Sequence, residues 1–296
     1  MSAGTAISPR GGELLASFRR NRIAGTALVV LCVIVLAALF SPAVSPQNPY
    51  DLAQLDIMDS KMPPGTRSAE GGVYLLGTDE QGRDMLSAIL YGLRISLGVG
   101  VASTLIALTL GMAIGLAAGY AGGWIDALIM RIVDLQLSFP SILIALVLLA
   151  VLGQGVDKIV VALVFVQWAY YARTVRASAL VEKRKEYVDA AVCLAYGPWR
   201  ILYRHILPNC LPPLIVVATV QVAHAIALEA TLSFLGLGMP ITSPSLGLLI
   251  ANGYAHLLSG KYWMSFFPGV ALLVTILAIN LVGDHLRDAL NPRLNT

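Results

Sequence analysis

Residues 173–208 read RTVRASALVEKRKEYVDAAVCLAYGPWRILYRHILP, a basic and mostly polar stretch between two long apolar runs. Good helix formers from Val181 to Ala195 predict a short helix. We expect Gly197-Pro198 to break it, because glycine ends helices and proline fits the first position of the next one. A second short helix is expected from Trp199 to Ile206, and Pro208 then leads back to the apolar sequence.

The first of these helices has one face of small and apolar side chains. Tyr187, Ala190, Ala191 and Leu194 follow one another at the i, i+3, i+4 and i+7 spacing of a single helix face. A short helix with such a face can lie in a groove on another protein. It can also pack only against the helix ends of its own chain, and the spacing does not decide between the two.

The rest of the chain has the composition of a membrane protein. It is 57% hydrophobic and 12% charged, whereas soluble domains carry about 25% charged residues. A spanning helix needs about 20 mostly apolar residues. We therefore expect an all-α integral membrane protein with six transmembrane helices, the third broken by Pro140. The apolar runs are Ile23–Phe40, Ile95–Ala118, Trp124–Leu152, Ile159–Ala172, Leu214–Leu235 and Phe267–Val282.

The distribution of lysine and arginine predicts the orientation in the membrane. The N-terminal residues, the 173–208 loop and the tail are rich in arginine and lysine, while the 41–93 segment holds many acids. Basic loops stay on the cytosolic side, so both termini and the loop are expected there. The expected segments are a cytosolic N-terminal part with an interfacial helix (1–22), the first span (23–40), an external segment (41–93), a five-helix core containing the loop (94–290) and a cytosolic tail (291–296).

The first apolar run also resembles a signal peptide, with an arginine-rich start and small residues after it. It is longer than the usual apolar region of about 7–15 residues, so we expect it to be retained as a span. Before it, Leu14, Leu15 and Phe18 stand beside Arg19 and Arg20. This pattern suits a short helix in the membrane interface, or a flexible basic tail.

The chain carries no recognisable catalytic motif. It has no G-x-x-x-x-G-K-[ST] phosphate loop, no G-x-S-x-G elbow and no H-E-x-x-H pair. The histidines have no metal-ligand spacing, and Cys32, Cys193 and Cys210 suggest no disulfide framework. We therefore expect no enzyme activity, no bound cofactor or metal and no nucleic-acid partner.

Several polar and small residues occur at membrane depth. Glu229 and His224 lie in the fifth run, where an ionisable group usually faces a partner or an aqueous path. They are candidates for lining a pathway, and Glu229 is equally suited to a buried hydrogen-bonding role. Asp134 and Arg131 are spaced to pair on one helix face. The glycines Gly111, Gly115 and Gly119 allow close helix packing, within the chain or against a partner.

Asp189-Ala190-Ala191 followed by Leu207-Pro208 resembles the EAA loop of bacterial ATP-binding cassette importer permeases. Asp189 stands where the family has glutamate, and Ala195 stands at the family's glycine, so we expect the turn two residues later, at Gly197. Motifs in the same order make the chain most similar to the C-type permease of the dipeptide, oligopeptide and nickel group. They are Leu76–Asp84, Ser138–Pro140, Arg204–Asn209, Leu232–Gly238 and Gly283–Pro292.

The resemblance implies a type I importer permease fold in a bacterial inner membrane. It implies a second, homologous permease, two ATPase subunits that bind ATP and Mg, and an external solute-binding protein. It also implies that the loop couples the chain to an ATPase. The residues expected in that role are Glu186, Tyr187, Asp189, Ala190, Ala191, Leu194, Ala195, Gly197, Pro198, Leu207 and Pro208. The alternative is an ion-coupled secondary transporter using Glu229, Asp134 or Arg131, although we find no paired broken helices of the usual kind.

Overall fold

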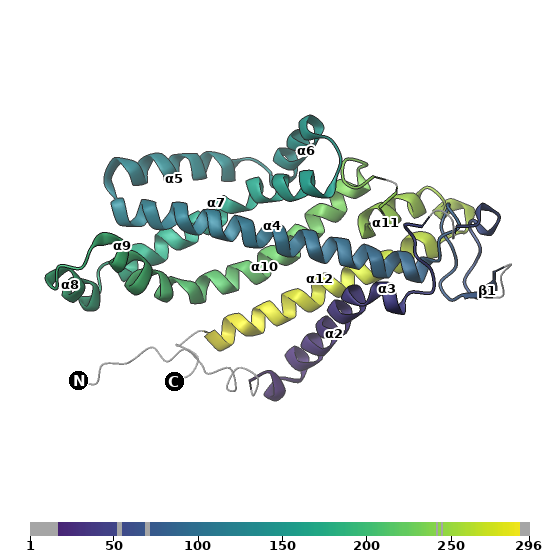
Figure 1. Ribbon diagram of the computed structural model, residues 1–296, viewed down its shortest axis with the longest axis horizontal. Helices are drawn as coiled ribbons and strands as arrows, with labels where there is room; N and C mark the ends of the chain where they lie inside the picture. The colour runs from purple at the N-terminus through teal and green to yellow at the C-terminus, as the bar shows by residue number, and fades with distance from the viewer. Residues whose placement is uncertain (1–16, 52–54, 69–71, 241, 244, 291–296) are drawn as a thin grey trace.

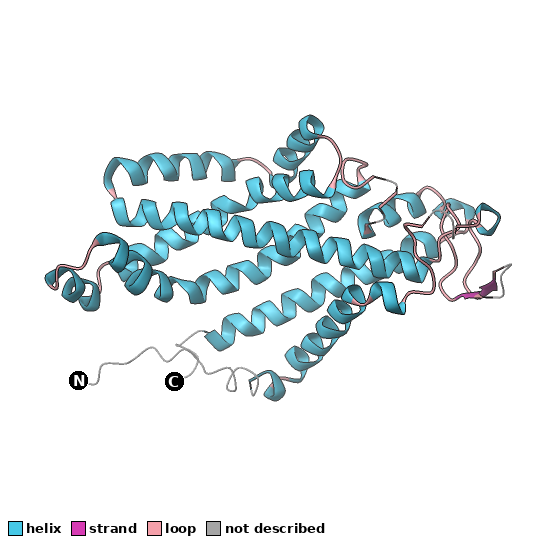
Figure 2. Cartoon of the chain, in the orientation of Figure 1, coloured by secondary structure: helices cyan, strands magenta, loops and turns pink. Residues whose placement is uncertain are grey.

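The computed structural model describes residues 17–51, 55–68, 72–240, 242–243 and 245–290. Long helices lie roughly side by side along the molecule (Figure 1), and in the described part the strands are confined to one short hairpin (Figure 2). The α-helices are α2 (Arg22–Leu39), α3 (Ser41–Val44), α4 (Met85–Ala121), α5 (Gly123–Ser138), α6 (Ser141–Leu152), α7 (Val156–Glu182), α8 (Glu186–Cys193), α9 (Pro198–Ile201), α10 (Leu207–Phe234), α11 (Leu246–Tyr254) and α12 (Trp263–Leu290). The shorter elements are η2 (Ile57–Asp59), β1 (Thr66–Arg67), β2 (Val73–Tyr74), η3 (Leu202–Ile206) and η4 (Leu257–Ser259).

The described helices include four that are long and apolar enough to cross a membrane, or five if one bent pair counts as a single span. The bent pair is α5 and α6, which meet at an angle of 91°. The break falls at Pro140, as the sequence predicted, because proline disfavours helix for the residue before it. The remaining predicted span is α7, which is long enough but carries Lys158, Arg173 and Arg176 among its apolar residues. By length and composition alone, the described helices thus provide four or five membrane spans and not the predicted six.

Helix α4 is 37 residues long, and local sequence signals determine where it begins and ends. At its start, the Asp84 carboxylate accepts a hydrogen bond of 2.8 Å from the backbone N–H of Ser87, which satisfies a free donor of the first turn. At its end, Gly122 has a φ of 66°, a conformation that glycine adopts without steric cost. The helix starts well before the apolar run that predicted it and spans most of the molecule (Figure 1).

The glycines of α4 allow it to pack directly against the backbone of α7. A Cβ atom placed on Gly111 would lie 2.4 Å from the carbonyl oxygen of Trp168, and one on Gly115 would lie 2.4 Å from that of Ala172. On Gly119 it would lie 3.0 Å from the Cβ of Ala179. The close approach is therefore made within the chain, which was one of the two interpretations of this spacing.

The end of the molecule opposite α8 is built from residues of the 41–93 segment and the α11–α12 connection (Figure 1). Strands β1 and β2 pair antiparallel there. The Asp59 carboxylate accepts hydrogen bonds from Ser68 Oγ at 3.2 Å and Tyr74 OH at 2.8 Å. An ion-pair contact between Glu80 and His256 joins this segment to the region after α11. The described part of the 41–93 segment is thus a folded cap at this end of the molecule.

The first described residues pack against the end of the last helix. Phe18 is buried, and its ring meets the ring of His285 edge-on with 4.5 Å between centroids. Ser17 Oγ lies 3.1 Å from His285 Nε2. Leu14 and Leu15, the other apolar residues of the predicted interfacial helix, lie outside the described residues.

Candidate coupling site

Helix α8 is anchored to the membrane helices through one side. Val188 and Ala191 are buried in a cluster with Val175 of α7 and with Ile201 and Ile206 of the following segment. This packing fixes the position of α8 relative to α7 and α10. A displacement of α8 would therefore be transmitted to both helices.

Glu182, the last residue of α7, ties the start of α8 in place. Its carboxylate accepts a hydrogen bond of 2.6 Å from Tyr187 OH and pairs with Lys185 Nζ at 2.6 Å. Burial and the adjacent Glu182 carboxylate raise the pKa of the Tyr187 phenol, so the phenol stays protonated and keeps donating. Asn209 Nδ2 in turn donates to Tyr187 OH at 3.2 Å. Tyr187 thus links α7, α8 and α10.

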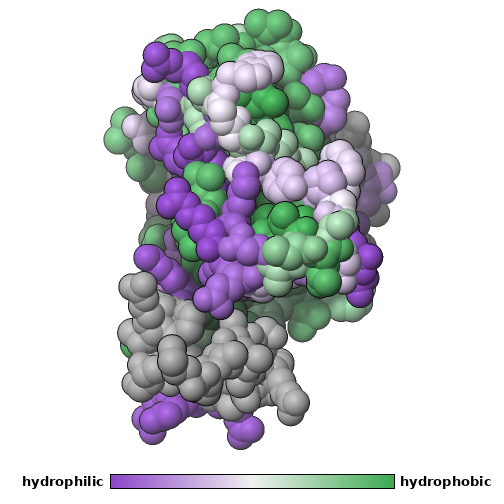
Figure 3. Space-filling model, turned by 90° about the vertical axis from the view of Figure 1, so that its left-hand side faces the viewer, coloured by the Kyte–Doolittle hydropathy of each residue, from purple (hydrophilic) through white to green (hydrophobic). Residues whose placement is uncertain are grey.

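The predicted face of α8 is divided by the structure. Ala191 points into the buried cluster, whereas Tyr187, Ala190 and Leu194 are exposed. Asp189 and Glu186 are exposed as well. Further exposed apolar side chains lie nearby on the same segment, namely Val192, Trp199 and Tyr203. Figure 3, which looks onto this end of the molecule, shows apolar patches among hydrophilic ones.

The turn after α8 lies at Ala195, and our prediction that it would come two residues later was wrong. Ala195 has a φ of 55° and donates its N–H to Val192 O at 2.9 Å, while Tyr196 donates to Ala191 O at 3.2 Å. These two hydrogen bonds form a Schellman motif, which usually places glycine at the left-handed position. Gly197 has an ordinary φ of −63° and precedes α9, whose first residue is Pro198. The alanine therefore adopts the conformation expected of the family's glycine.

The second short helix is not a separate element, which corrects the predicted helix–turn–helix with a return at Pro208. Residues Pro198–Phe234 form one continuous helical span, with a π-helical turn at Leu202–Ile206. The N–H of Leu207 bonds to the carbonyl of Leu202. Pro208 has no N–H to donate, and a π turn is one way to accommodate that loss without ending the helix. Leu207 and Pro208 thus lie in the first turn of α10.

Two ion pairs connect α5 to the half of α7 that leads to α8. Arg176 donates to both carboxylate oxygens of Asp126, at 2.5 Å each. Arg173 pairs with Asp134. The predicted pair of Asp134 with Arg131 is therefore wrong, because a long arginine on the neighbouring helix reaches the carboxylate instead.

Glu229 lies in the protein interior and is fully buried. Its carboxyl group accepts hydrogen bonds of 2.8 Å from Ser96 Oγ of α4 and 2.8 Å from Ser233 Oγ of α10. His224 is exposed on another face of α10. Glu229 thus has the contacts of a structural hydrogen-bonding group, and pathway lining by either residue stays a prediction.

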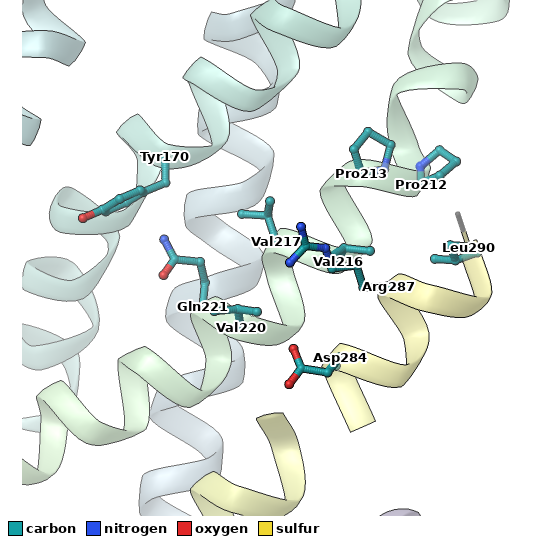
Figure 4. A pocket seen from close by; sticks show the side chains of 11 residues that line it. Tyr170, Pro212, Pro213, Val216, Val217, Val220, Gln221, Asp284, Arg287 and Leu290 are labelled. Atoms are coloured by element: carbon teal, nitrogen blue, oxygen red, sulfur yellow. The ribbon is translucent and has the colours of Figure 1, made fainter. Parts of the chain in front are cut away.

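A cavity of about 650 Å³ lies between α10 and α12, with Tyr170 of α7 at its edge (Figure 4). Its walls are mostly valine and proline, and its polar groups are Gln221, Asp284 and Arg287. These three residues did not emerge as candidates from the sequence. The acid and the base three residues apart at the end of the last span were the available signal, but only the fold brings Gln221 to the same cavity.

The membrane-length helices and the partly exposed α8 at one end of them define a helical membrane protein. The family model for the binding-protein-dependent transport system inner membrane component matches residues 111–296. The model for the N-terminal transmembrane domain of oligopeptide transport permease C matches residues 11–64.

Curated relatives match over almost their full length. The di/tripeptide transport system permease protein DppC of Pseudomonas aeruginosa is 38% identical, covering 95% of this chain and 92% of its own. The dipeptide transport system permease protein DppC of Escherichia coli K12 is 41% identical, covering 94% and 91%. A putative peptide transport system permease protein of Brucella abortus is 41% identical, covering 93% and 89%.

A solved chain of the MetNI methionine ABC transporter, described in inward-facing conformations, shares the fold. Its TM-score is 0.57 at 19% sequence identity, covering 70% of this chain and 98% of that one. The chain therefore belongs to the binding-protein-dependent transport system inner membrane component family, and it is a permease subunit of an ATP-driven importer. Such a subunit works in the inner membrane with ATPase and substrate-binding protein partners.

Proposed function

We propose that this chain forms one half of the translocation pathway of a peptide importer and is moved through α8. The exposed side of α8, set against its buried anchor, carries the proposal: Ala190 and Leu194 face outward while Val188 and Ala191 fix the helix to α7 and α10. An ATPase subunit docked on the outer side would thus move the membrane helices directly. The names of the relatives favour small peptides as the solute.

The proposed assembly contains a second, homologous permease, two ATPase subunits and an external solute-binding protein. ATP and Mg would bind to the ATPase subunits and not to this chain. Counting α7 and the α5–α6 pair as spans gives six crossings, with both termini and α8 on the cytosolic side. The basic residues of the 173–208 loop support this orientation.

Co-purification of the ATPase subunits tests the docking surface. Leu194 is 65% exposed, so Leu194→Glu places a charge on the surface without opening the buried cluster. Combined with Asp189→Arg, it is expected to reduce the ATPase retained by the tagged chain at least tenfold. Changing Ala191 would be less informative because Ala191 is buried.

Met58→Glu is the matched control, because Met58 is an apolar residue that is 84% exposed at the opposite end of the molecule. It should retain the ATPase as the unchanged chain does. Equal retention by the α8 variant and the control would contradict docking through α8.

A further inference from the structure

The cavity between α10 and α12 is separate from the coupling surface and has the features of a ligand site. We propose that it binds short peptides through their charged ends, with Arg287 for the carboxylate and Asp284 for the ammonium group. This inference rests on the proposed function, because it assumes that peptides pass through this subunit. A volume of about 650 Å³ is within the range of about 300–1,000 Å³ seen for small-molecule sites.

The two charged groups have no partner among the residues that the structure describes. Neither Asp284 nor Arg287 makes an ion pair or a side-chain hydrogen bond there. They stand three residues apart on one helix, where Cβ atoms are about 5–6 Å apart. An extended chain of two residues spans at most about 7 Å. The spacing of the two side chains along the helix is therefore similar to the length of a very short peptide.

Gln221 supplies a complementary group for the peptide bond. Its side chain is only 7% exposed and has no hydrogen-bond partner in the described part of the chain. Its amide atoms are not among the fully buried polar atoms of the described residues that lack a partner, so the amide is open to the cavity. The amide has both a donor and an acceptor, as does a peptide bond. Figure 4 shows Gln221 on α10 and Asp284 and Arg287 on α12 around the same space.

The walls of the cavity suit side chains of varied size. Val216, Val217 and Val220 present apolar surface without further charge. Pro212 and Pro213 lie inside α10 and donate no helical hydrogen bond to the carbonyls one turn earlier. The two prolines leave α10 unbroken and add apolar surface to the cavity wall. Recognition would thus rest on the peptide's ends and backbone.

The test measures peptide binding to the importer complex in nanodiscs, with no solute-binding protein present. The probe is tritiated alanyl-phenylalanine, and the competitor is its N-acetylated, C-amidated form, which carries no charge. Binding should be saturable and resistant to the capped competitor. Asp284→Asn and Arg287→Gln should each weaken it about tenfold or more, as expected for loss of a hydrogen bond to a charged group.

Asp288→Asn is the matched control, because Asp288 is an exposed acid on the same helix that does not line the cavity. It should bind the probe like the unchanged complex. Equal binding by all three variants, or equal competition by the capped peptide, would overturn the site. So would an Arg287 effect seen only when the nanodiscs contain phosphatidylglycerol, which would assign that arginine to lipid headgroups.

ATP-driven uptake of the same peptide by proteoliposomes with the solute-binding protein separates the two proposals. Absence of uptake by the unchanged complex would refute the proposed function and the site with it. Normal uptake together with unaltered probe binding in Asp284→Asn and Arg287→Gln would refute the site alone.

Discussion

Ala195 occupies a backbone conformation that L-residues avoid. Its φ of 55° places Cβ close to the following carbonyl, which costs roughly 1–2 kcal/mol. The Schellman hydrogen bonds at the end of α8 and the packing of Ala191 hold the turn in this form. The strain lies directly beside the proposed docking surface, at the point where α8 ends.

Ala195→Gly should therefore stabilise the protein. The gain from removing the left-handed strain exceeds the extra backbone freedom of glycine in the unfolded chain, and we expect about 0.5–1 kcal/mol. Thermal unfolding of the purified complex would measure it as a higher Tm. Ala190→Gly, in the middle of the same helix, should lower the Tm, because glycine destabilises helix interiors by about 0.5–1 kcal/mol. A lower Tm for Ala195→Gly would contradict the conformation described here.

Glu229 shows how a single buried polar residue links two helices. The residue is fully buried, and its hydrogen bond from Ser96 joins α4 to α10, whereas Ser233 bonds to it within α10. Buried carboxyl groups are tolerated only when such partners surround them. Full burial argues against Glu229 as an ion-coupling group, because no solvent reaches its carboxyl group in this conformation.

At the scale of elements, the contact between α4 and α7 depends on the absence of side chains. Gly115→Ala should destabilise the pair by about 1–3 kcal/mol, because its Cβ would lie 2.4 Å from the backbone oxygen of Ala172. Gly98→Ala on the same helix meets no atom within 4 Å, so it should be neutral or stabilising by up to about 1 kcal/mol. The Tm of the two purified variants would compare them directly, and similar values would contradict direct backbone packing.

Features that depend on residues close together in the sequence could be predicted, whereas features that depend on contacts between helices could not. Four of the six predicted spans, or five with the bent pair, and the break at Pro140 are confirmed, because they depend on runs of apolar residues and on one proline. The helix end at Ala195 was missed because a tertiary contact, not a glycine, holds the turn. The partner of Asp134 was missed because Arg173 belongs to another helix. The cavity was missed because Gln221 and Asp284 line the same space only in the folded chain.

At the scale of the whole molecule, the two ends have different characters. One end carries α8 and α9, together with the start of α2 and the end of α12. The other end carries the hairpin and α11 (Figure 1). The helices between them are long enough to separate two aqueous sides. Under the proposed function each end would meet a different partner, and the orientation would decide which partner reaches α8.

Cys193 provides a natural probe of that orientation. It is an exposed cysteine on α8, whereas Cys210 is buried. In a Cys32→Ser background, a membrane-impermeant maleimide should label Cys193 in inside-out vesicles but not in right-side-out vesicles, because only the former expose the cytosolic side. The vesicles should come from cells that express the chain without its ATPase partners, so that nothing covers α8.

Met58→Cys, made with Cys193→Ser in the same background, should give the opposite pattern, because Met58 lies at the other end of the molecule and is exposed. The two variants test one membrane-crossing arrangement from both sides. Labelling of both positions from the same side would refute the proposed topology, since α8 and the cap would then share one aqueous compartment. An ATPase could not in that case reach α8 while a solute-binding protein acts on the opposite side.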